Sequence, residues 1–410
     1  MSARAPLHLE GTTLEGGGQL LRIAIGVSSL TKVPINITNI RGKRSGGGGL
    51  KAQHLTSVQW LGKASKARVS GIGLKSKEIT FVPNIQGGQN SHEREMEIKQ
   101  STPGSVNLVF QALLPYLLFS QSSGPLPFNT EGAAHAQRPI QLRVTGGTNV
   151  SNSPSFEYIQ QVLVPMLEKI GIPLIGAEVH SRGWSQGTTR LGTVTYTVTP
   201  LSKKLPAFQL VDRGVVKSVK ATIIAPRETE RMIRDELDVM FEKAEHLLFG
   251  TNGVGDIEIT FEDSRHEKRY YLLLVATTST GMKLGRDWLY DRGVRAGKPD
   301  TIVSSLVKQV ANELITELKH GGCVDEFLRD QLVIFQALAE GTSAVDGGKR
   351  KGEYAIPSLH TKTAQWVVGE MLGVKFDEAG SCEGSAFVPG SNNTIVEHLA
   401  EGLQNLVVKN

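Results

Sequence analysis

The spacing of apolar residues predicts short strands that alternate with helices along most of the chain. Residues 19–30 carry apolar side chains at helical spacing, whereas residues 34–40 alternate between apolar and polar positions, as a half-buried strand does. Read in this way, residues 6–85 give the order βαβαββ. The expected elements are a strand at 7–9, a helix at 19–30, a strand at 34–40, a helix at 50–64, and strands at 67–69 and 78–82.

The same order of elements recurs in residues 95–200 and again after residue 320. The second unit is expected to contain a strand at 95–99, a helix at 104–118, a strand at 126–129, a helix at 156–170, and strands at 175–180 and 192–198. The third is expected to contain a helix at 324–339, a strand at 353–356, a helix at 363–372, and strands at 374–376 and 385–388. Three similar units in succession predict an internally repeated α/β domain.

Residues 205–319 interrupt the repeat and predict a smaller α/β domain of order βαββα. Its expected elements are a strand at 215–224, a helix at 227–248, strands at 257–261 and 270–277, and a helix at 301–319. The fold class is therefore α/β (α+β), with a large domain formed by residues 1–204 and 320–410. The basic string at 281–286 fits either a contact with a polyanion or a packing piece of the insertion.

Composition limits the class of protein. The 410 residues exceed the roughly 250–300 at which a single core stops growing, which agrees with an insertion. Two distant cysteines, Cys323 and Cys382, exclude a disulfide framework and a cysteine-rich zinc site. The chain has neither an apolar leader at its start nor a run of roughly 18 apolar residues, so we expect an intracellular protein without a membrane partner. The net charge of +5 suits an anionic ligand.

The candidate chemistry begins at His360, which precedes the expected helix at 363–372. The first N–H groups of a helix are unpaired and attract phosphate, and a histidine there can serve as nucleophile, acid or base. The chain has 10 histidines, so an ordinary surface or capping residue is the alternative. Many of the 45 glycines cluster, as at 16–18 and 46–49, which is typical of loops that approach a ligand closely.

Four stretches, taken together and in order, resemble the RNA 3'-terminal phosphate cyclase family. They are LEGGGQLLR at 14–22, IRGKR at 40–44 followed by GLKAQHL at 49–55, EFLRDQL at 326–332, and LHT at 359–361. The resemblance covers nearly the whole chain, and the insertion falls where the family has its smaller domain. It implies ATP and an RNA with a 3'-phosphate end as substrates. In the family, ATP adenylylates a histidine, AMP passes to the RNA 3'-phosphate, and the 2'-hydroxyl then closes a 2',3'-cyclic phosphate.

The resemblance also implies a role for particular residues. The family's nucleophile matches His360, and Glu15 matches the acidic residue near a divalent metal, Mg²⁺ or Mn²⁺. The residues matched to ATP binding are Gln111, Phe327, Leu328, Arg329, Asp330 and Gln331, and those matched to the triphosphate or the RNA end are Arg22, Arg41, Arg44, Gln53 and His54. Each has a structural alternative: Gln111 could make only a structural hydrogen bond, His54 could be satisfied by backbone, Glu15 could be a loop acid, and the arginines of the glycine loop could be solvated.

Two departures from the family pattern affect loops. The stretch RGWSQGTTR at 182–190 lacks the usual proline and most glycines, and the loop at 44–49 has glycine where a proline is common. Two other functions remain as alternatives: a non-catalytic relative that serves ribosomal RNA processing, and a transferase of the enolpyruvyl type on a similar repeated fold. The presence of His360, Glu15 and Gln331 favours the cyclase. Resemblance to eukaryotic members implies residence in the nucleus.

Overall fold

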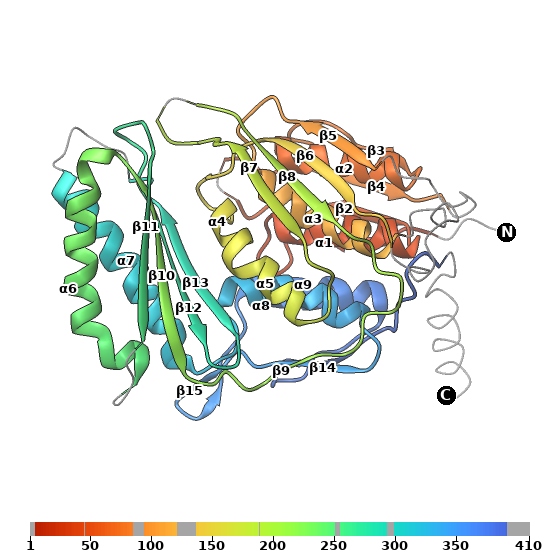
Figure 1. Cartoon of the computed structure of the whole chain (residues 1–410). Helices are drawn as coiled ribbons and strands as arrows, with labels where there is room; N and C mark the ends of the chain where they lie inside the picture. The colour runs from red at the N-terminus through yellow and green to blue at the C-terminus, as the bar shows by residue number, and fades with distance from the viewer. Residues whose placement is uncertain are drawn as a thin grey trace, which may run out of the picture.

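The computed structural model describes residues 5–44, 46–84, 94–120, 137–187, 189–250, 255–292 and 299–391. It confirms a mixed α/β chain. Figure 1 shows the repeated units grouped on one side and the inserted segment, drawn in green and cyan, on the other. No helix within these ranges is long and apolar enough to cross a lipid bilayer.

The first two units share one topology. Their sheets have the orders β1-β2-β4-β3 and β5-β6-β8-β7, each with a parallel first pair and antiparallel remaining pairs. The elements of the first unit are β1 (Leu7–Glu10), α1 (Gly18–Thr31), β2 (Ile35–Thr38), α2 (Ala52–Ala64), β3 (Arg68–Ser70) and β4 (Ile79–Val82). The expected order βαβαββ is confirmed for this unit.

The second unit contains one strand that the sequence did not predict. Its elements are β5 (Glu95–Lys99), α3 (Val106–Phe119), β6 (Ile140–Gly146), α4 (Phe156–Tyr158), a π-helical turn (Ile159–Leu163), α5 (Val164–Lys169), β7 (Gly176–Ser181) and β8 (Gly192–Val198). The strand that pairs with β5 is β6, which we did not predict although Ile140, Leu142 and Val144 alternate as buried residues. The strand expected at 126–129 lies outside the described residues.

The third unit differs most from expectation. Its elements are α8 (Glu326–Leu338), β14 (Thr342–Val345), a hairpin of β15 (Lys349–Arg350) and β16 (Glu353–Tyr354), α9 (Leu359–Leu372) and β17 (Ser381–Glu383). The strands expected at 374–376 and 385–388 are wrong; β14 instead pairs with β17 and with β9 (Gln209–Leu210). Because β9 precedes the insertion, the chain leaves this sheet after Leu210 rather than at residue 205.

The insertion has the order βαβββα. It contains β10 (Val216–Ala225), a 3-10 turn (Arg227–Thr229), α6 (Glu230–Phe249), β11 (Asp256–Asp263), β12 (Tyr271–Thr278), β13 (Lys283–Leu289) and α7 (Pro299–His320). The basic string at 281–286 therefore runs into a strand, and Arg286 pairs with Glu317 within the fold. Helices α6 and α7 lie on the outer side of the sheet (Figure 1), whereas Gly285 faces the second unit, where an added Cβ would lie 2.6 Å from Val162.

Four helices from all three units pack together beneath the sheets. Helix α1 contacts α3 and α9, and α9 contacts α8. Helix α3 carries almost only apolar residues, and every residue of it except Gln111 is buried. These helices bring the segments that contain the candidate residues into one region.

Candidate active site

Two helix N-termini meet at the candidate site. Helix α9 begins at Leu359 because the Oγ of Ser358 accepts a hydrogen bond from the Thr361 N–H, at 3.2 Å. The helix thus starts four residues before the expected 363–372, and His360 lies in its first turn. Helix α1 begins at Gly18, and its N-cap residue, Gly17, offers no side chain to the first amides. Unpaired N–H groups at both ends favour a bound anion.

His360 and Glu15 face each other between these helices. The imidazole Nε2 lies 3.9 Å from Oε1 of Glu15, and the two side chains are 47% and 5% exposed. The N–H of Glu15 donates a hydrogen bond to Oγ1 of Thr363, at 3.1 Å, which ties the first loop to α9. A Cβ on residue 17 would lie 2.0 Å from Oε1 of Glu15, so any larger residue there would displace this carboxylate.

The surroundings of His360 favour the neutral imidazole. Partial burial lowers its pKa below the ordinary value of 6.5, and the charges of Arg22 and Arg44 lower it further. Glu326 acts in the opposite direction but is the weakest of these influences. At neutral pH the ring therefore keeps an unshared electron pair, which a nucleophile needs.

Glu15 is the one predicted metal ligand, and its setting fits a cation. Arg44 forms an ion pair with it. Both carboxylate oxygens are buried, and apart from this ion pair neither receives a hydrogen bond from the described residues. No group of three or more histidine, cysteine or acidic side chains in the described ranges could hold a metal by itself. A single carboxylate is nevertheless compatible with Mg²⁺, which keeps waters and takes further oxygens from phosphates.

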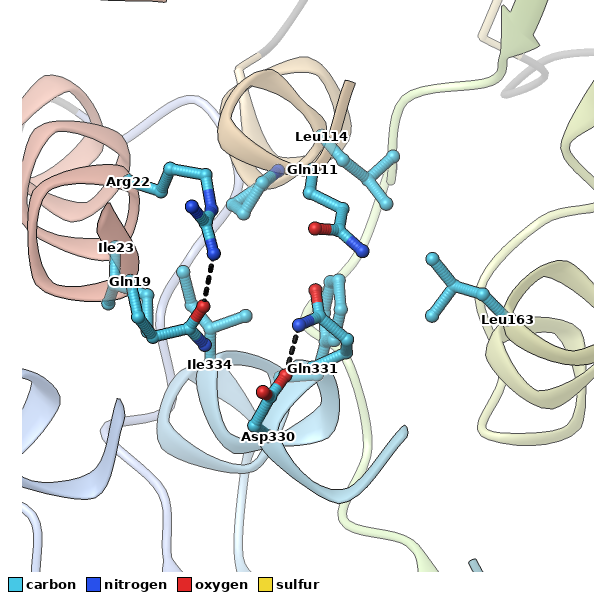
Figure 2. A pocket seen from close by; sticks show the side chains of 11 residues that line it. Gln19, Arg22, Ile23, Gln111, Leu114, Leu163, Asp330, Gln331 and Ile334 are labelled. Atoms are coloured by element: carbon cyan, nitrogen blue, oxygen red, sulfur yellow. Dashed lines mark hydrogen bonds between the residues drawn. The ribbon is translucent and has the colours of Figure 1, made fainter. Parts of the chain in front are cut away.

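A small cavity lies between α1, α3 and α8 (Figure 2). Its volume is about 30 Å³, room for one or two water molecules. It gathers three of the residues matched to ATP binding, Gln111, Asp330 and Gln331, together with Arg22. The side chain of Gln111 points toward Gln331 across the cavity, and it makes no hydrogen bond with any described residue. The structural hydrogen bond weighed for Gln111 is therefore not made with a described residue, and its role in nucleotide binding stays a prediction.

The polar side of this cavity forms two hydrogen-bonded pairs. Nη2 of Arg22 donates to Oε1 of Gln19 at 2.5 Å, and the amide of Gln331 donates to Asp330. Burial raises the pKa of Asp330 to about 7, against the opposing charge of Arg22. Burial also lowers the pKa of Arg22 to about 10. Sequence reasoning gave Gln19 no role, although it stands three residues before Arg22 on the same helix, a spacing that places the two side chains together.

His54 and Gln53 connect α2 to its neighbours. Nδ1 of His54 accepts a hydrogen bond from the Lys51 N–H at 3.2 Å, and the side chain is buried. Burial, followed by the charges of Arg22, Arg41 and Lys51, holds the pKa of His54 well below 6.5. The proton therefore sits on Nε2, which faces the start of α1, since a Cβ on Gly18 would lie 2.6 Å from it. Oε1 of Gln53 accepts from the Ser105 N–H at 3.2 Å, at the start of α3.

The remaining predicted residues lie at different places. Leu328 is buried in the core, and Arg329 turns away from the cavity to donate to the carbonyl of Ala355 at 3.1 Å. Phe327 is 44% exposed, and the guanidinium of Arg286 lies over its ring, 4.2 Å from the centroid. Arg41 has a φ of 55° and donates to the carbonyl of Gly49 at 3.2 Å, which closes the glycine loop.

Comparison with known proteins gives one family. A sequence model described as RNA 3'-terminal phosphate cyclase matches residues 13–377. An RNA 3'-terminal phosphate cyclase of Drosophila melanogaster is 30% identical over 384 residues, covering 92% of this chain and 94% of the relative. One from Pyrococcus abyssi is 31% identical over 378 residues, covering 91% and 95%. A third, from Desulfurococcus amylolyticus, is 32% identical over 348 residues, covering 83% and 86%.

Proposed function

The chain belongs to the RNA 3'-terminal phosphate cyclase family, and from this membership we propose that it is a catalytically active, ATP-dependent cyclase that works through a covalent histidine–AMP intermediate. One observation carries the proposal: His360 is exposed in the first turn of α9, has a lowered pKa and faces Glu15. A non-catalytic relative would not need a nucleophile at this position.

In the first step an unshared pair of the imidazole attacks the α-phosphorus of ATP. The new N–P bond forms as the bond to pyrophosphate breaks, and the departing group takes the electron pair. Arg22 and Arg44, whose charges reach His360, balance the negative charge that develops on the phosphates. The unpaired amides at the starts of α1 and α9 act in the same direction.

Gln111, Asp330 and Gln331 are proposed to hold the nucleoside. The cavity between them is too small for an adenosine, so binding requires Gln111 and Gln331 to move apart. The exposed ring of Phe327 offers a face for stacking on the base, a contact worth roughly 1–3 kcal/mol. Glu15 would hold Mg²⁺ or Mn²⁺ together with the phosphates of ATP, and the ion would supply charge neutralisation there.

The RNA steps use the activated AMP. An oxygen of the RNA 3'-phosphate attacks the phosphorus of the histidine adduct, and the imidazole leaves with its electron pair. The adjacent 2'-hydroxyl then attacks the RNA phosphorus, which closes the cyclic phosphate and releases AMP.

The alternative function is a non-catalytic factor in ribosomal RNA processing. Residence in the nucleus stays a prediction, because the relatives include archaeal proteins.

Incubation with α-labelled ATP and Mg²⁺ tests the enzyme half of the proposal. We expect an acid-labile labelled protein that is lost in His360→Ala and kept in His246→Ala, an exposed histidine on α6. Label on the His360→Ala protein would overturn the choice of nucleophile. An unlabelled wild-type protein would favour the non-catalytic alternative.

Conversion of an RNA 3'-phosphate to a phosphatase-resistant end tests the substrate half. A strand with a deoxyribose at its 3' end should accept AMP and go no further, because it lacks the 2'-hydroxyl. A labelled enzyme that converts no RNA end would contradict this half alone.

A further inference from the structure

A groove of about 640 Å³ lies between the second unit and the inserted domain. One wall comes from β7 and the connection to β8, which is the stretch that departs from the family pattern. The other wall comes from the end of β11 and the turn after it. Five arginines line the groove: Arg182, Arg190, Arg227, Arg265 and Arg269. The groove is more basic than the cavity beside Gln111, and the proposed reaction chemistry does not use it.

The arginines outnumber the acids that could neutralise them. Glu262 pairs with Arg182, which also binds the buried Glu157. Asp263 lies 3.6 Å from Arg227. Arg190 and Arg265 are exposed and form no ion pair with any described carboxylate. A groove with unneutralised guanidinium groups is suited to a polyanion, since each group can bind a phosphate through two hydrogen bonds.

Contacts with buried residues hold the walls of the groove in place. The guanidinium of Arg269 lies 5.3 Å from the ring centroid of buried Trp184, and its Nε donates to the carbonyl of Gln186 at 3.3 Å. Gly187 has a φ of 70°, a backbone conformation that favours glycine, and it lies against the ring of His266. Arg190 and Arg269 line the same groove, and burial, followed by the charge of Arg190, lowers the pKa of Arg269. A bound phosphate would relieve that repulsion.

The groove is connected to the candidate active site through one helical stretch. Glu157, at the start of α4, binds Arg182 of the groove, and Leu163, at the end of the π turn, lines the cavity that holds Gln111 and Asp330. At about 1.5 Å per residue, the rise between Glu157 and Leu163 is on the order of 10 Å. The groove and the cavity therefore lie at the two ends of one short helical stretch.

We propose that this groove binds the phosphate backbone of the single-stranded RNA that precedes the 3'-phosphate end. The inference rests on the proposed function. Trp184 is buried and covered by Arg269, so it offers no face for a base, and recognition is expected to be independent of sequence. The altered loop at 182–190 would then give this chain its own way of holding RNA.

The test compares substrates of two lengths in the variant Arg190→Gln/Arg265→Gln. One substrate is a 3'-phosphorylated oligoribonucleotide longer than the roughly 4–16 nucleotides of ordinary single-strand sites. The other is a 3'-phosphorylated dinucleotide. We expect KM for the long RNA to rise on the order of tenfold and the salt slope of its kcat/KM to fall by roughly 0.7 for each lost contact. The dinucleotide reaction and adenylylation with ATP alone should not change.

The matched control is Lys243→Gln/Lys308→Gln, which removes two exposed charges from the outer helices α6 and α7. It should leave both substrates unaffected. An unchanged KM for long RNA, or an equal loss with both substrates, would overturn the proposal. Failure of the proposed function is distinguishable, because wild-type protein would then process neither substrate. In that case the affinity for the labelled long RNA is measured by fluorescence anisotropy. Equal affinities of the wild type and Arg190→Gln/Arg265→Gln would overturn the proposal that the groove binds RNA.

Discussion

The Nε2 atom of His360 lies 3.9 Å from Oε1 of Glu15, although the two residues come from the third and the first repeated unit. Neither residue makes a hydrogen bond to the other at this distance. Glu15 is held in place by the hydrogen bond from its N–H to Thr363 and by its ion pair with Arg44. The lowered pKa of His360 keeps the imidazole neutral beside this carboxylate at neutral pH. The repeat brings the candidate nucleophile and the candidate metal ligand together at two helix ends.

The first prediction concerns the pKa of His360. Burial lowers it most, followed by Arg22 and Arg44, so its protonation midpoint should lie below that of an ordinary histidine. Arg44→Gln removes a nearby positive charge and leaves Glu15 without its partner. Both changes favour the imidazolium, so the midpoint should move to higher pH. NMR titration of the ring, without ATP, measures this directly.

The acid limb of adenylylation should move in the same direction, because only the neutral ring can attack. Lys243→Gln, on the outer face of α6, serves as the control and should leave the midpoint in place. A midpoint that stays fixed or falls in Arg44→Gln would show that the arginine does not act on His360.

The second prediction concerns Glu15 and the divalent metal. Glu15→Gln keeps the shape of the side chain but removes its negative charge, and Arg44 is exposed enough to be hydrated when unpaired. The Mg²⁺ concentration for half-maximal adenylylation should rise on the order of tenfold or more, a range typical of changes around a bound metal. The melting temperature should change little. A normal Mg²⁺ requirement in this variant would remove Glu15 from the metal site.

Local patterns in the sequence predicted most helices and the first-unit sheet. The reason is that a helix such as α1 carries its own periodicity, and the sequence of its first turn marks its start. The motif residues on α1 and α8 lie within a few positions of one another, so the sequence could place each group on one helix; their roles stay a prediction. For α9 the start was misplaced by four residues, since the cap at Ser358 was not recognised.

Contacts between segments that lie far apart in the sequence could not be predicted from such local patterns. Strand β9 has two residues and exists because β14 lies beside it, and β13 contains Gly285 because another unit packs closely there. Nothing local to Arg286 indicates that it lies over Phe327 and pairs with Glu317. The different directions of Leu328 and Arg329, next to Asp330, follow from helix geometry: adjacent positions on a helix face different ways.

The third prediction concerns the buried pair of Arg286 and Glu317. Both side chains are less than 10% exposed, at 8% and 9%, and their geometry joins β13 to α7. Arg286→Met alone leaves Glu317 as an uncompensated buried charge and should lower the free energy of unfolding by about 3–5 kcal/mol. Adding Glu317→Gln removes that charge and should recover most of the loss. Chemical denaturation measures both; a double variant as unstable as the single one would contradict this account.

The same pair of variants separates stability from nucleotide binding. Arg286 covers one face of Phe327, so the stable double variant should still bind ATP less tightly if the guanidinium orients the ring. Phe327→Tyr keeps an aromatic face and should bind ATP as the wild type does. Phe327→Ala should lose roughly 1–3 kcal/mol of binding. Calorimetric titration with ATP distinguishes these cases.

The fourth prediction concerns Asp330 and the dependence of stability on pH. Burial raises the pKa of this carboxyl from 3.8 to about 7 in the folded chain. The unfolded chain therefore loses the proton at lower pH than the folded chain, and this group's contribution to the free energy of unfolding declines as pH rises from about 4 to about 7. Asp330→Asn removes that decline while keeping a side chain that can pair with Gln331. The melting temperature of the variant, relative to wild type, should thus be higher at about pH 8.5 than at about pH 5.5. Asp238→Asn, an exposed carboxylate on α6, should show no such difference, and an equal offset at both pH values would mean that Asp330 ionises as an ordinary aspartate does.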